Sequence, residues 1–252
     1  MGFGAIIIGE EIIRGKRLDK HFSRLVEIMG ERGLKLDWCT YLGDDPALIT
    51  AMLKRTLDTD DVVFSFGGIG ATPDDHTRQC AGTAAGMPLE LHPEAEVLLR
   101  ERFGAETTLL RLQMGVFPRG SNIIPNPHNK VPGFSCRHHH FVPGFPVMAW
   151  PMCAWVLDTH YPHLFHRVDE TEAAIFVYEL PESTITPLMT EVEAKHPGLK
   201  SFSLPNMGGG PERRHIELGA RGAPDAVAQT IECFKQGVVE LGGRWSSTLD
   251  PK

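Results

Sequence analysis

A glycine-rich loop followed by two aspartates is the part of the sequence best suited to chemistry. From residue 65 the chain reads SFGGIGATPDDHT. Glycine tolerates positive φ and lets the backbone approach a ligand closely, and three glycines fall here, at Gly67, Gly68 and Gly70. We expect a helix to begin within residues 73–75, with free N–H groups and a positive dipole end that favour phosphate. Thr72 adds a hydroxyl donor, so the loop predicts a phosphate site, although a glycine turn before a capped helix fits the same residues.

Carboxylates stand next to this loop and at one other place where a strand is expected to end. Asp44 follows Gly43, and Asp75 ends the glycine loop. Two carboxylates beside a phosphate can hold Mg²⁺ through oxygen ligands, so Asp44 and Asp75 are our candidate metal and catalytic residues. Asp45 and Asp74 fit the N-caps of the helices that follow them. Asp74 is also a candidate ligand contact because it belongs to the loop.

The elements that position these residues alternate between strands and helices. We expect strands at 5–8, 34–39 and 61–65, with helices between them. This alternation is typical of an α/β fold, a mostly parallel sheet in three layers with helices on both faces. Ligands of such sheets bind beyond the carboxyl ends of the strands, where residues 9–15, 43–45 and 67–75 should meet. The first helix is expected to bury one apolar stripe, made of Leu18, Phe22, Leu25, Val26 and Met29.

The composition and the periodicity of the sequence change at two places in the rest of the chain. Seven prolines within residues 117–151 indicate long, shaped loops of the kind that often carry function. After residue 166 the periodicity predicts a small α+β unit in the order β-α-β-β-α. The expected domains are therefore 1–166 and 167–252.

Composition excludes several classes of protein. The chain of 252 residues has 25 Lys and Arg against 32 Asp and Glu, a net charge of −7 that disfavours general nucleic-acid binding. No apolar run approaches the roughly 20 residues that span a membrane. The apolar run at residues 5–8 is short and has no basic residue before it, so we expect a buried strand there and not a signal peptide, and the five cysteines form no C-x-x-C pair. We therefore expect a cytoplasmic protein with reduced thiols.

Two other clusters are expected to be structural. Consecutive strand residues point to opposite faces, so we do not expect His138, His139 and His140 to ligate one metal ion together. Trp150 and Trp155 form an apolar cluster that suits the core or the interface of a homo-oligomer.

The order of these motifs resembles the molybdopterin-binding domain family, related to MoaB and Mog proteins, and in particular its CinA N-terminal branch. The matching segments are GEEII-x-G from Gly9, then Asp19, GDD from Gly43, and GGIGATPDD-x-T from Gly67. Later loops at 126–134 and 142–146 are also similar, so the resemblance covers residues 4–165. It implies a three-layer fold with a pocket at the glycine loop, shaped by Glu11, Asp19 and Asn126. The C-terminal unit is similar to that branch's small middle domain, and we expect no deamidase domain to follow.

This resemblance implies chemistry on a phosphate anhydride beside a metal. Mog-type relatives bind molybdopterin and adenylylate it with Mg²⁺, and CinA-type relatives hydrolyse the pyrophosphate of ADP-ribose. Three segments depart from the family pattern: Lys20-His21, Asn129-Lys130 and Met148, which stands where the family has a glutamate. We expect a protein that binds a phosphorylated pterin or nucleotide with a divalent metal. The alternatives are an active metal-dependent nucleotide pyrophosphatase and a non-catalytic interaction module on the same fold.

Overall fold

The buried N-terminal run forms an inner strand of a six-stranded sheet in the computed structural model, which describes residues 1–167, 170–208 and 213–250. The chain divides into two compact units, Met1–His166 and Arg167–Lys252. In the first unit the strands lie in the order β2-β1-β3-β8-β7-β6. The first four are parallel to one another, and the last two pair antiparallel. Their bounds are β1 Phe3–Ile8, β2 Trp38–Leu42, β3 Val62–Phe66, β6 Asn122–Ile124, β7 Gly133–Cys136 and β8 His139–Val142.

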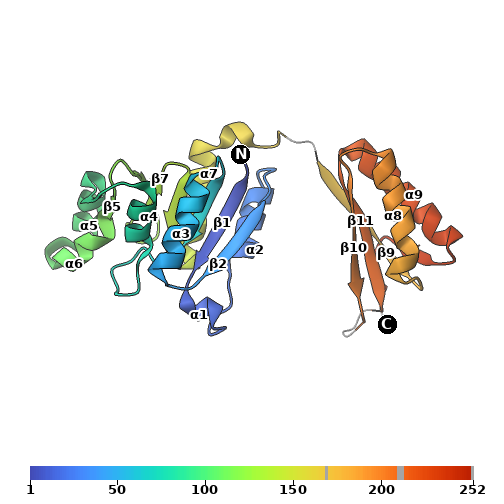
Figure 1. Cartoon of the computed structure of the whole chain (residues 1–252), viewed down its shortest axis with the longest axis horizontal. Coiled ribbons are helices and arrows are strands. Elements are labelled where there is room, and N and C mark those ends of the chain that lie inside the picture. Colours follow the sequence, from blue (N-terminus) through green and yellow to red (C-terminus); the bar gives the residue numbers. More distant parts are fainter. Residues whose placement is uncertain (168–169, 209–212, 251–252) are drawn as a thin grey trace. The chain divides into compact units, whose positions relative to one another are not determined.

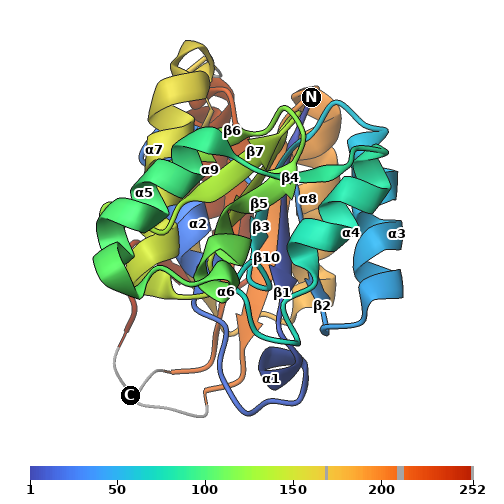
Figure 2. The same ribbon diagram turned by 90° about the vertical axis from the view of Figure 1, so that its left-hand side faces the viewer.

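Helices cover both faces of this sheet, which confirms the predicted α/β layers. Figure 2 shows α2 (His21–Gly30) and α7 (Pro146–His160) on one face, and α3 (Pro46–Leu57) and α4 (Thr77–Ala85) on the other. Two separate apolar cores lie between the sheet and these helix pairs. The face that carries α3 and α4 also holds a stack of three rings, Phe117, Phe134 and Phe141, with centroids 4.6 and 4.5 Å apart.

Shorter elements complete the first unit. A two-stranded antiparallel sheet joins β4 and β5 beside α4. The remaining bounds are α1 Glu10–Ile13, β4 Leu89–Leu91, α5 Pro93–Phe103, α6 Leu109–Leu112 and β5 Val116–Pro118, with single 3₁₀ turns at Gly104–Glu106, Gln113–Gly115 and Pro162–Leu164.

Two expectations for the first unit were wrong in detail. The strand expected at 34–39 runs from Trp38 to Leu42, and its register with β1 begins with Trp38 opposite Gly4. Asp37, just before it, bonds Phe3 through both its backbone N–H and its carboxylate. The apolar stripe of α2 is narrower than expected. Leu25 and Met29 are buried, whereas Leu18, Phe22 and Val26 are exposed. The helix begins at residue 21, so its inward face is His21, Leu25, Ile28 and Met29.

The second unit is an antiparallel sheet with two helices packed on it (Figure 1). Its strands lie in the order β10-β11-β9-β12. The bounds are β9 Thr171–Tyr178, α8 Glu182–Lys195, β10 Lys200–Asn206, β11 His215–Gly222, α9 Pro224–Glu240 and β12 Arg244–Ser246. The expected β-α-β-β-α order is present, and β12 is an additional short edge strand beside β9.

The five cysteines carry free thiols. Cys80, Cys136 and Cys153 are buried, and Cys39 and Cys233 are half-buried. None of the helices within the described ranges is long and apolar enough to cross a membrane.

Candidate functional site

The glycine loop, residues 67–75, connects the end of β3 to α4 and folds tightly against neighbouring backbone. Gly67 and Gly68 have φ values of 96° and 68°, in the left-handed region where side chains are strained. A Cβ at Gly67 would collide with the carbonyl oxygen of Ile8, and one at Gly68 would collide with the Thr77 hydroxyl. Glycine is therefore required at both positions by the close approach of the loop to β1 and α4.

The helix after the loop begins later than expected, at Thr77 instead of within residues 73–75. Thr77 folds back on the loop: its N–H donates to the Gly68 carbonyl, and its hydroxyl donates to the Gly67 carbonyl, both at 3.0 Å. The N-cap residue is His76, which makes no capping side-chain bond. Our expectation that Asp74 caps this helix was wrong, whereas Asp45 does cap α3, accepting from Ala47 and Leu48.

Residues 72–75 form a tight turn held by a carboxylate. Asp75 Oδ2 accepts from the Thr72 N–H at 2.8 Å and from the Thr72 hydroxyl at 2.5 Å. The Asp75 N–H donates in turn to the Thr72 carbonyl at 3.0 Å. One oxygen of Asp75 is thus committed to shaping the loop, and Thr72 is held in place at its rim.

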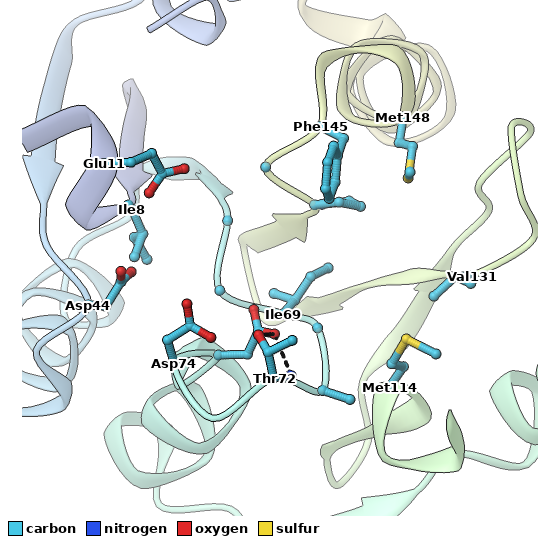
Figure 3. A pocket seen from close by; sticks show the side chains of 18 of the residues that line it. Ile8, Glu11, Asp44, Ile69, Thr72, Asp74, Met114, Val131, Phe145 and Met148 are labelled. Carbon is cyan, nitrogen blue, oxygen red and sulfur yellow. Dashed lines mark hydrogen bonds between the residues drawn. The ribbon is translucent and has the colours of Figure 1, made fainter. Parts of the chain in front are cut away.

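An acidic group lies on one side of the loop (Figure 3), where Glu11, Asp44 and Asp74 line the same cavity. Asp44 Oδ2 accepts from the Glu10 N–H at 3.0 Å. Burial raises the pKa of Asp44, and the negative charges of Glu11, Asp74 and Glu10 raise it further. Asp74, which is exposed, has a lowered pKa because the nearby Thr72 hydroxyl and its own backbone N–H favour its charged form, while the hydroxyl proton itself is bonded to Asp75. Asp74 is thus a carboxylate whose charge acts on Asp44, whereas Asp75, which also lines the cavity, uses one oxygen to hold the loop.

The opposite side of the cavity is apolar. The cavity has a volume of about 460 Å³. Figure 3 shows Phe145 and Met148 across the loop from the acidic group, with Met114 and Val131 beyond Ile69. Phe145 is 58% exposed, so its ring is available to a ligand. A cavity with an acidic end, a glycine-rich floor and an apolar end suits a ligand that joins a phosphate to a ring.

Two cations of the site were absent from our sequence-based expectations. Arg17 lines the cavity from the loop after α1, with Nη1 4.0 Å from Glu11 Oε1. Arg78 lies below the glycine loop and donates from Nη2 to the Gly70 carbonyl at 2.6 Å. Neither has a sequence signal of its own, because an arginine after a helix or within one is usually a surface residue.

Two residues that we expected to shape the pocket do not line the cavity themselves. Asp19 accepts from the N–H groups of His21 and Phe22 and from the Tyr41 hydroxyl, so it fixes the start of α2. Asn126 is buried and ties its own loop together through Asn129 and the Val131 carbonyl. That loop places Asn129, Val131 and Pro132 in the cavity wall. Asn126 thus shapes the pocket by holding a loop that forms part of its wall, whereas Asp19 holds the start of α2 and contributes no part of the wall.

Only some of the residues that depart from the family pattern lie at the cavity. Met148 lines it and accepts from Asn129 Nδ2 at 3.4 Å. His21 is buried, stacks on Phe66, and pairs its Nε2 with the Gly144 carbonyl at 3.1 Å. Burial lowers the pKa of His21. Lys130 reaches Glu101 at 3.5 Å, and its side chain is outside the lining.

The histidine cluster belongs to the core. His139 Nε2 bonds Thr56 Oγ1 at 2.7 Å, and His140 bonds Ser135 Oγ and the Tyr161 hydroxyl, both at 2.8 Å. Burial lowers the pKa of His139 and His140 to about 3. Among the residues described, no group of three or more His, Cys, Asp or Glu is arranged to hold a metal ion by itself.

Comparison with known proteins agrees with this geometry. Residues 4–166 match the family model described as a probable molybdopterin binding domain. A CinA-like protein of Anaeromyxobacter dehalogenans is 34% identical over 185 residues, which are 69% of this chain and 44% of that protein. A CinA-like protein of Geobacter metallireducens is 29% identical over 76% of this chain and 48% of its own length. The chain thus spans about half the length of these relatives.

A solved structure shares the fold. The crystal structure of the protein CinA from Thermoplasma acidophilum aligns with a TM-score of 0.58 and 23% identity, covering 63% of this chain and 98% of that one. The family match covers most of the chain and includes the glycine loop, the acidic group and the apolar wall. This chain is therefore a member of the molybdopterin-binding domain family and is CinA-like.

Proposed function

We propose that the cavity binds a phosphorylated pterin or nucleotide together with a divalent cation, Mg²⁺ being the best fit. The observation that carries the proposal is the division of one cavity into an acidic end, a glycine loop and an apolar end. The phosphate would lie on the backbone of the glycine loop. The ring of the ligand would lie against Phe145, Met114 and Met148.

The residues present fit a cation that arrives with its phosphate. Burial raises the pKa of Asp44, and the negative charges of the neighbouring carboxylates raise it further, so a cation between them would relieve this repulsion. Mg²⁺ commonly uses one or two carboxylates, substrate phosphate oxygens and waters, so a complete protein cage is unnecessary. Asp44 and Asp74 would hold the ion, and Asp75 would keep the loop in shape through Thr72.

The chain's own groups perform the binding. When bound, the cation would neutralise phosphate charge and polarise a phosphoryl oxygen. Arg17 and the loop N–H groups would hold the remaining phosphate oxygens. Cleavage of a pyrophosphate needs an additional group that activates water, and Met148 puts a thioether into the wall. We therefore favour binding over hydrolysis.

Calorimetric titration of the full chain tests this proposal, with pyrophosphate, ADP-ribose and molybdopterin as probes, each with and without Mg²⁺. Asp44→Asn removes the charge but keeps an acceptor for the Glu10 N–H. The matched control is Asp45→Asn, since Asp45 lies outside the cavity lining and asparagine caps a helix equally well.

Asp44→Asn should weaken Mg²⁺-dependent binding about 10- to 100-fold, as changes around a metal site commonly do. Asp45→Asn should leave binding within about twofold, because surface charges away from a site contribute little. Equal effects of the two variants would remove the metal assignment. Mass spectrometry of the same mixtures detects turnover, and cleaved ADP-ribose would replace our binding proposal with a pyrophosphatase.

A further inference from the structure

Arg78, the second residue of α4, is a buried cation beneath the glycine loop. Its side chain is 2% exposed. Nη2 donates to the Gly70 carbonyl at 2.6 Å, and Nη1 donates to the carbonyls of Gln113 and, at 3.2 Å, Val116. All three acceptors are neutral backbone groups. In the described part of the chain, Nε has no hydrogen-bond partner.

This arrangement leaves the charge of Arg78 without a counter-ion. The negative charge of Asp75 acts on Arg78 electrostatically, but no salt bridge joins the two side chains within the described residues. Arg32 shows the contrast, since it makes a bidentate ion pair with Asp158 at 2.6 and 2.8 Å. A buried charge without a partner is costly, and such charges are normally paired. An anion bound on the loop above Arg78 would supply the missing negative charge.

The three carbonyls also belong to two segments that contribute different walls of the cavity, through Gly70 and Met114. Gly70 is part of the glycine loop, whereas Gln113 and Val116 flank Met114, which lines the apolar end (Figure 3). These segments lie more than 40 residues apart in the sequence. In the described structure Arg78 is bonded to both, so a shift of the loop would be transmitted to the segment that carries Met114.

We propose that Arg78 is a positioning residue that joins the phosphate end of the cavity to its apolar end, and that its charge is balanced by the ligand's anionic group. The inference has an electrostatic half, the balance of the Arg78 charge, which rests on the proposed function because that function supplies the anion. Its mechanical half, the coupling of the two walls through Arg78, does not depend on any ligand. It predicts that the two walls loosen together when Arg78 is shortened. It also predicts that anion affinity follows the charge at position 78.

Hydrogen exchange of the ligand-free full chain tests the mechanical half. Arg78→Met and Arg78→Lys remove the fork of donors. Arg100→Met is the control, because Arg100 is a half-exposed cation that pairs with Glu96 on its own helix, α5. Losing hydrogen bonds to a charged group should speed exchange about tenfold or more, in residues 67–75 and 113–116 together. Faster exchange in one segment alone, or in neither, would overturn the coupling.

Pyrophosphate titration in Mg²⁺ tests the electrostatic half. Arg78→Met should weaken binding about 10-fold or more, the effect of losing a charge-assisted interaction, whereas Arg78→Lys should stay within about threefold of the wild type. A purely structural role would make the two variants equally weak, because lysine cannot span three carbonyls. Equal affinities would therefore overturn the charge assignment.

The failure of this inference is distinguishable from failure of the proposed function. If the wild type binds none of the phosphate probes, the proposed function and the charge assignment both fail, while the exchange result still decides the coupling. If Arg78→Met does not fold, Arg78→Gln takes its place as the neutral variant in both measurements. Normal exchange and normal pyrophosphate affinity in Arg78→Lys and Arg78→Gln would then leave Arg78 without the role proposed.

Discussion

Replacing Gly67 by alanine should destabilise the N-terminal unit far more than the same change at Gly86. Both glycines have positive φ, 96° at Gly67 and 68° at Gly86. A Cβ at Gly67 would collide with the Ile8 carbonyl, which belongs to the buried strand β1 and cannot move away. A Cβ at Gly86, the residue after α4, would meet nothing within 4 Å. Gly86→Ala therefore measures the backbone cost alone.

The expected free energies follow from these two terms. Left-handed backbone costs an alanine about 1–2 kcal/mol, which is the whole effect expected at Gly86. At Gly67 a strained backbone costs about 1–3 kcal/mol and the collision about 1–3 kcal/mol more, giving a total of about 2–6 kcal/mol. That total is a large part of the roughly 5–15 kcal/mol that stabilises a domain.

Urea unfolding followed by tryptophan fluorescence measures this difference. Three of the four tryptophans, Trp38, Trp150 and Trp155, lie in the Met1–His166 unit, so their signal reports its unfolding. The free energy of unfolding should fall by about 1–4 kcal/mol more for Gly67→Ala than for Gly86→Ala. Equal losses would mean that the loop moves away from β1 at no cost, and the argument that glycine is required there would be refuted.

Three further outcomes are expected. Since the pKa values of His139 and His140 are lowered to about 3, the folded state binds fewer protons than the unfolded state, and stability should fall as the pH drops from about 6.5 to about 3; urea midpoints that stay flat over this range would contradict their burial as neutral rings. Thr77→Val should cost about 1 kcal/mol by removing one hydroxyl bond to the loop, and an unchanged urea midpoint would show that this bond does not stabilise it. Arg32→Ala should cost about 1 kcal/mol or less at low salt, with a smaller loss in 1 M NaCl, because its ion pair with Asp158 is partly exposed; a loss independent of salt would point to packing.

The sequence was most informative where local rules agree. Strands β1 and β3 are continuous apolar runs, and α3 has an aspartate cap and a proline in its first turn, so all three were predicted near their observed positions. The glycine loop and Asp44 were placed correctly at the same edge of the sheet, because parallel strands bring their carboxyl ends together.

Errors arose where distant residues decide the local structure. The register of β2 with β1 begins only at Trp38, opposite Gly4, and apolar periodicity alone placed the strand too early. The start of α4 is set by Thr77 folding back on the loop, a contact that no capping rule contains. Arg78 and Met114 became site residues only through contacts between segments far apart in the sequence.

The distribution of thiols gives the protein two natural labelling positions. Cys80, Cys136 and Cys153 are buried, which leaves Cys39 in the first unit and Cys233 in the second for thiol reagents. Burial, with a smaller effect of the Asp19 charge, raises the pKa of Cys39 to about 11, so little thiolate is present there at neutral pH and the residue should react slowly. A maleimide dye added briefly at pH 7 should therefore mark the C-terminal unit first. A fluorophore can thus be placed on α9, in the unit that does not contain the glycine loop, without any mutation.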